Sequence, residues 1–120
     1  MPRKYKPKFF TMDEFDCTHT GRNEMKMPFI KLLDELRGAC DFPFVITSGY
    51  RDQSHPLERD KERPGYHTKG IAVDIAVSNG HQRRVLVEEA IYMGFGGIGV
   101  ANSFVHVDDR SGPAVMWTYK

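Results

Sequence analysis

Hydrophobic side chains recur along the chain with two different periods, and these periods distinguish helices from strands. The helical period is clearest after Pro28, a residue suited to the first helical position. Apolar residues then follow at spacings i, i+3, i+4 and i+7, namely Phe29, Leu32, Leu33 and Leu36. Gly38 is placed to end this helix. A second helix is predicted over residues 81–93, stopped by Gly94, and a capping-box pattern over residues 11–14 predicts a short helix.

The other hydrophobic runs alternate apolar and polar positions, as in strands that cover a core with one face. Strands are predicted over residues 44–47, 71–77, 98–100, 104–108 and 115–119. Residues 101–103 suit a tight hairpin, whereas residues 52–66 lack periodicity and indicate a long polar loop. The predicted fold class is therefore α+β, with a small antiparallel sheet packed against a few helices.

Two of the predicted strands carry chemically active side chains on the face opposite their apolar residues. In residues 71–77, Asp74 lies on the face away from Val73 and Ile75. In residues 104–108, His106 lies on the face away from the two valines. Because burying an unpaired carboxylate is costly, Asp74 needs a cation, a set of hydrogen-bond donors or a metal ion. The two strands can aim Asp74 and His106 at one point.

His67, seven residues before Asp74, adds a second imidazole to this pair. Two neutral imidazoles and one carboxylate suit zinc, and three protein ligands leave a fourth position open for water, as in catalytic zinc sites. The sequence thus predicts one zinc ion bound by His67, Asp74 and His106. His55 is a weaker candidate for a further ligand, because its neighbours indicate an exposed turn.

Length, charge and cysteine content restrict the class of protein. The chain has 120 residues, 40% of them hydrophobic, which suits a single domain with one core. The 17 basic and 16 acidic side chains nearly balance, which argues against a nucleic-acid-binding protein. Residues 1–8 are expected to form a flexible basic terminus. Cys17 and Cys40 lack metal-binding spacing and are expected to be buried or free thiols.

Five blocks of sequence follow one another in an order that resembles a known family. They are Ile-Thr-Ser-Gly-Tyr-Arg at residues 46–51, His67, Gly-Ile-Ala-Val-Asp at 70–74, Gly-Phe-Gly-Gly-Ile-Gly at 94–99 and Phe-Val-His-Val-Asp at 104–108. Together they resemble the zinc D-alanyl-D-alanine carboxypeptidases and phage L-alanyl-D-glutamate peptidases, over nearly the whole chain. The resemblance implies a Hedgehog-like fold and a zinc metallopeptidase that hydrolyses bacterial peptidoglycan peptides.

The resemblance and the residue types together indicate roles for the residues around the metal ligands. Arg51 would lie beside the substrate in the cleft and bind a substrate carboxylate or the developing oxyanion. Ser48 and Tyr50 flank Arg51 and either donate hydrogen bonds to the substrate or pack and cap the strand end. Trp117 either forms a wall of the cleft or fills the core.

The general base is where this chain departs from the family. Many relatives carry an acid three positions before the last histidine, or a histidine two positions before it, and this chain has Ser103 and Phe104 there. Asp108 is the nearest acid on the same strand face as His106. We expect it to orient a ligand histidine, with the general-base role as the alternative.

If Asp108 has neither role, Glu58 and Glu62 in the polar loop are the remaining acids that could serve as general base.

The absence of an acid at position 103 also leaves a second function possible. Hedgehog-type domains keep the metal without evident need for hydrolysis, so the alternative is a zinc-stabilised binding module of the same fold.

The chain has no run of about 18 apolar residues, so we expect no membrane-spanning helix. The N-terminus has no apolar stretch typical of a secretory signal peptide. We therefore expect a monomer that is synthesised in the cytoplasm and reaches the cell wall through a lysis system or a virion.

Overall fold

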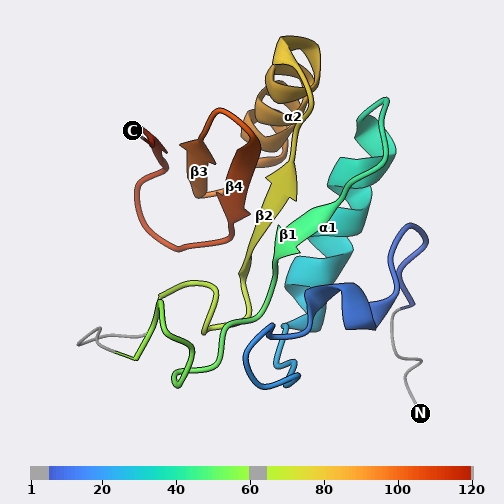
Figure 1. The fold of residues 1–120 in the computed structure, drawn as a ribbon. Coiled ribbons are helices and arrows are strands. Elements are labelled where there is room, and N and C mark those ends of the chain that lie inside the picture. Colours follow the sequence, from blue (N-terminus) through green and yellow to red (C-terminus); the bar gives the residue numbers. More distant parts are fainter. Residues whose placement is uncertain (1–5, 60–64, 120) are drawn as a thin grey trace.

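Two helices pack against one face of a five-stranded sheet (Figure 1). The computed structural model describes residues 6–59 and 65–119, so Glu62 and most of the basic N-terminal segment lie outside the described residues. The helices are η1 (Met12–Phe15), α1 (Met27–Ala39) and α2 (Gly80–Met93), and the strands are β1 (Ile46–Ser48), β2 (Ala72–Ala76), β3 (Gly97–Val100), β4 (Phe104–Asp108) and β5 (Val115–Thr118). Each predicted helix and strand is present, with ends shifted by one or two residues.

The strand order in the sheet is β1-β2-β4-β3-β5. The expected antiparallel pairing holds between β1 and β2, β2 and β4, and β3 and β4, but β5 pairs with β3 in parallel, so the sheet is mixed. β4 already has a neighbour on each side, and the chain that leaves it joins the sheet at the free edge of β3. Since the chain reverses direction after β4, which is antiparallel to β3, β5 runs parallel to β3.

Local sequence signals set the ends of the helices. The side chain of Asn79 accepts a hydrogen bond from the backbone N–H of Gln82, 2.9 Å away, at the start of α2. Gly94 ends the same helix in the left-handed conformation, with φ of 84°. In η1, the carboxylate of Glu14 accepts a hydrogen bond from the backbone N–H of Thr11, as the capping-box pattern predicts.

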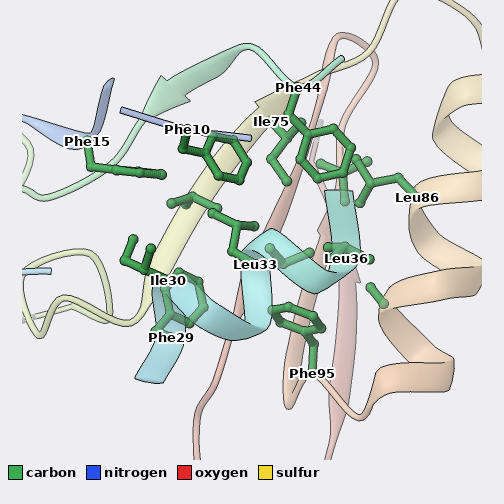
Figure 2. Packing of buried hydrophobic residues seen from close by; sticks show 14 of the residues in the cluster. Phe10, Phe15, Phe29, Ile30, Leu33, Leu36, Phe44, Ile75, Leu86 and Phe95 are labelled. Carbon is green, nitrogen blue, oxygen red and sulfur yellow. The ribbon is translucent and has the colours of Figure 1, made fainter. Parts of the chain in front are cut away.

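The core lies between the helices and the sheet (Figure 2). It includes the predicted apolar side of α1, except that Leu32 is only partly buried. Val73, Ile75, Val105 and Val107 are fully buried, which confirms the predicted alternation in β2 and β4. Consequently the opposite face of these two strands carries the polar side chains.

Two further expectations are met by the described residues. Cys17 and Cys40 are buried free thiols. In the described part of the chain, no helix has the length and apolar character needed to cross a bilayer.

Candidate metal centre

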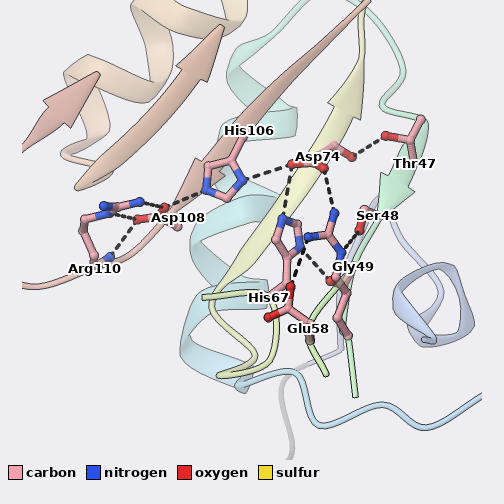
Figure 3. Close-up of polar contacts among 10 residues, drawn as sticks. Thr47, Ser48, Gly49, Glu58, His67, Asp74, His106, Asp108 and Arg110 are labelled. Carbon is pink, nitrogen blue, oxygen red and sulfur yellow. Dashed lines mark hydrogen bonds and ion pairs between the residues drawn. The ribbon is translucent and has the colours of Figure 1, made fainter. Parts of the chain in front are cut away.

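The pairing of β2 with β4 places Asp74 directly opposite His106. Oδ1 of Asp74 lies 3.0 Å from Nδ1 of His106 and 3.3 Å from Nε2 of His67 (Figure 3). His67 comes from the turn before β2, which ends at Gly70 with φ of 77°. A side chain at Gly70 would collide with the backbone carbonyl of Glu24, so glycine allows this turn to pack closely. The structure thus brings the three predicted zinc ligands together, and all are buried.

Each candidate ligand histidine has an oxygen acceptor on the side of its ring away from Asp74. Nδ1 of His67 donates to the backbone carbonyl of Gly49, 2.9 Å away, and Nε2 of His106 donates to Oδ2 of Asp108, 2.6 Å away. Both oxygens are acceptors, so each of these ring nitrogens carries the hydrogen. The other nitrogen of each ring faces Oδ1 of Asp74. Without a metal these inner nitrogens can donate to that carboxylate, and they are the ring nitrogens placed to bind a metal ion there.

The two inner ring nitrogens and the Asp74 carboxylate make the group suitable for a cation. One ligand atom from each of His67, Asp74 and His106 lies within 4.8 Å of the other two. Burial raises the pKa of Asp74, but hydrogen bonds from the two histidines outweigh it and hold the pKa well below its usual range. The carboxylate is ionised, and with two ring nitrogens it matches the donor set of a zinc site with one open position.

Asp108 is fully buried and has a hydrogen-bond partner at each oxygen. Oδ1 accepts from the backbone N–H and Nε of Arg110 at 3.1 and 2.9 Å, and Oδ2 accepts from Nη2 of Arg110 at 2.7 Å as well as from His106. Burial raises the pKa of Asp108, but the hydrogen bonds from Arg110 and His106 lower it to about 2. This geometry favours the orienting role over the general-base role.

Arg51 lies beside the candidate ligands, as predicted. Its Nε donates to Oγ of Ser48 at 3.1 Å, and its two terminal nitrogens lie 3.5 Å from carboxylate oxygens of Glu58 and Asp74. Ser48 therefore contacts the guanidinium and does not line the cleft. The hydroxyl of Tyr50 donates to Glu24 at 2.6 Å, which holds its side chain at a separate polar pocket. Tyr50 is thus not brought to the metal centre.

A cleft of about 360 Å³ lies over the three candidate ligands. Besides these ligands, charged side chains of Arg51, Glu58 and Arg110 line it, together with four aromatic residues, Tyr66, Phe104, Trp117 and Tyr119. Trp117 therefore forms a wall of the cleft and is not a core residue.

His55 lies outside the ligand group: its Nε2 is 3.3 Å from the Thr18 hydroxyl and its Nδ1 accepts from the backbone N–H of Leu57. Arg110 and Tyr66 are cleft residues that the sequence patterns did not single out. The period of two that placed Asp108 beside His106 continues to Arg110 and would have drawn attention to it.

Two histidines and one carboxylate at the base of an open cleft are the arrangement of a metal-dependent hydrolase. The comparison with protein families gives the same class: the model of the family Peptidase M15 matches residues 8–108. This match covers most of the chain, and the protein belongs to the Peptidase M15 family. It confirms the resemblance found in the five sequence blocks. No curated protein matches the chain in sequence.

Proposed function

We propose that the protein is a zinc-dependent peptidase that hydrolyses peptide bonds in bacterial peptidoglycan, either as a D-Ala-D-Ala carboxypeptidase or as an L-Ala-D-Glu endopeptidase. The observation that carries this proposal is the pair of inner ring nitrogens, from His67 and His106, that face the buried carboxylate of Asp74. Membership in the Peptidase M15 family supports the peptidase reaction. The open cleft above the ligands gives a peptide access to them.

In this proposal the chain's own residues hold and orient the reacting groups. When bound, zinc supplies a Lewis acid for the scissile carbonyl and makes a water molecule acidic enough to attack near neutral pH. Gly49 and Asp108 fix the two imidazoles through their outer nitrogens. Arg51, which is always charged, binds a substrate carboxylate or the oxyanion, and Ser48 orients its guanidinium.

Glu58 takes the proton of the attacking water in this proposal. Among the described residues that line the cleft, the carboxylates belong to Glu58 and Asp74, and Asp74 is assigned to the metal. The Glu58 side chain is 1% exposed, and its Oε1 accepts hydrogen bonds from the backbone of Gly65 and the hydroxyl of Thr68. Glu58→Gln should keep the zinc content and lower turnover by about 10²- to 10⁴-fold.

The test uses purified protein, zinc and isolated bacterial cell walls. Released products identified by mass should be free D-alanine if the D-Ala-D-Ala bond is cut, or peptides with an N-terminal D-Glu if the L-Ala-D-Glu bond is cut, and chelation should stop their release. Alanine at His67, Asp74 or His106 should abolish both stoichiometric zinc binding and release. Full metal content in all three variants would contradict the assignment.

The second candidate function is a zinc-stabilised binding module, which the absence of an acid at Ser103 favours. Stoichiometric zinc binding without any released fragment would support this module over the peptidase.

A further inference from the structure

The guanidinium of Arg110 forms hydrogen bonds to both carboxylate oxygens of Asp108. Nε contacts Oδ1 at 2.9 Å and Nη2 contacts Oδ2 at 2.7 Å, while the backbone N–H of Arg110 also donates to Oδ1. Paired charge-assisted bonds of this kind fix the plane of a carboxylate as well as its position. Asp108 accepts the Nε2 hydrogen of His106 from this fixed position.

Two aromatic rings enclose the same guanidinium. Its central carbon lies 4.3 Å from the ring centre of Tyr66 and 4.8 Å from that of Trp117. Tyr66 directly precedes the candidate ligand His67, and Trp117 belongs to β5. Arg110 therefore joins β4, β5 and the turn that carries His67.

Space for this arrangement comes from a glycine in the neighbouring strand. Gly97 of β3 pairs with Asp108, and a Cβ at Gly97 would lie only 2.5 Å from Nε of Arg110 and even closer to both oxygens of Asp108. The glycine run at residues 94–99 belongs to the sequence blocks that define the resemblance. At Gly97 the structure gives that run a specific use, which is to leave room for the bond between Arg110 and Asp108.

We propose that Arg110 is a positioning residue that acts through Asp108 to fix the tautomer and orientation in which His106 binds a metal. A rotated carboxylate would no longer accept the Nε2 hydrogen of His106, and the ring would then hold its hydrogen on Nδ1, which faces Asp74. Nδ1 must be free of hydrogen to bind a metal ion, so that change would weaken metal binding. The inference rests on the proposed function, because it takes His106 to be a metal ligand.

The test compares Arg110→Gln and Arg110→Lys with the wild-type protein. Glutamine removes both the charge and the planar guanidinium. Lysine keeps the charge but cannot bind both carboxylate oxygens in one plane. Both variants should weaken zinc binding by about 10- to 100-fold, measured by competition with a chromogenic chelator. Arg84→Gln is the matched control, because Arg84 pairs with Glu88 on the exposed surface of α2 and should leave zinc affinity unchanged.

A second measurement reads the His106 ring directly in the zinc-saturated protein. Nitrogen NMR should find its Nε2 hydrogen protected by the bond to Asp108 in the wild type and exchanging faster with water in both Arg110 variants. A purely structural role would lower the unfolding temperature without moving this signal. Arg110→Lys is the more conservative variant, so both measurements can still be made on it if Arg110→Gln does not fold.

A double-mutant cycle tests whether Arg110 acts through Asp108. In an Asp108→Asn background, Arg110→Gln should cause no further loss of zinc affinity. An equal further loss, or wild-type zinc affinity and an unchanged His106 signal in both single variants of Arg110, would overturn the inference. Neither readout requires turnover, so a zinc-binding protein that releases no cell-wall fragments would refute the proposed hydrolysis and leave this inference standing.

Discussion

Replacing Gly97 by alanine tests the packing around Asp108 with a single methyl group. The new Cβ would lie well inside the 3.4–4 Å of ordinary contact with both Asp108 oxygens and with Nε of Arg110. To restore ordinary contact distances, the Asp108 and Arg110 side chains would have to move about 1 Å away from residue 97. The bonds that hold the carboxylate, now 2.6 to 3.1 Å long, would then exceed the usual hydrogen-bond limit of about 3.2 Å.

The expected cost follows from the bonds that are lost. A hydrogen bond to a charged group contributes about 1.5–3 kcal/mol, so losing two of them costs about 3–6 kcal/mol. Alanine is better than glycine inside a strand by about 0.5–1 kcal/mol, which offsets only a small part. We therefore expect Gly97→Ala to reduce the free energy of unfolding by about 2–5 kcal/mol, a large fraction of the 5–15 kcal/mol typical of a domain.

Urea unfolding of the metal-free protein measures this loss, and zinc titration of the same samples should find weaker binding. Gly80→Ala in α2 is the control, because a Cβ there meets only the end of the Arg83 side chain at 3.8 Å. That variant should be as stable as the wild type or more stable by up to about 1 kcal/mol. A Gly97→Ala protein within about 1 kcal/mol of the wild type and with unchanged zinc affinity would refute the described packing.

Three other changes probe different parts of the molecule. Arg51→Lys keeps the charge but loses the planar fork, and should lower kcat/KM on peptidoglycan peptides by about 10- to 1000-fold at unchanged zinc content and unfolding temperature. Asn79→Ala removes the cap of α2 and should cost about 1 kcal/mol in urea unfolding, which Asn79→Asp should largely avoid. Burial and the hydrogen bond to Glu24 raise the pKa of Tyr50 to about 12. Since the unfolded chain loses this proton near its ordinary pKa of 10.0, stability should fall as pH rises from there toward 12, and a Tyr50→Phe variant should lack that part of the fall.

The parts of the fold that sequence predicted well are those that depend on local periodicity. Alternation in β2 and β4 is a property of each strand alone, and it placed Asp74 and His106 on the face opposite the core before their pairing was known. Burying an unpaired carboxylate is costly, so the position of Asp74 in an apolar strand indicated that metal ligands or other partners lie around it. The end of α2 followed from Gly94 in the same local way.

The features that sequence did not predict depend on packing between distant segments. The parallel pairing of β5 depends on which sheet edge is free after β4 has formed, and that pairing makes Trp117 a cleft wall. Tyr50 adjoins Arg51 in sequence, yet its hydroxyl is held by Glu24, a residue 26 positions away. Glu58 comes from a loop without periodicity, so no pattern could place it in the cleft.

The shape of the cleft depends on two glycines in β3, which have no side chains. Gly97 and Gly99 pair with Asp108 and His106 on one side of β3, and Gly99 pairs with Trp117 on the other. A side chain at Gly99 would collide with the indole of Trp117, whose ring lies 5.2 Å from that of His106. Glycine at every second position of β3 therefore lets an aromatic side chain from the edge strand β5 cross β3 and reach a histidine on β4. Two glycines separated by one residue, in a strand next to one that carries histidine and aspartate two residues apart, are therefore a sequence signal for an aromatic cleft wall.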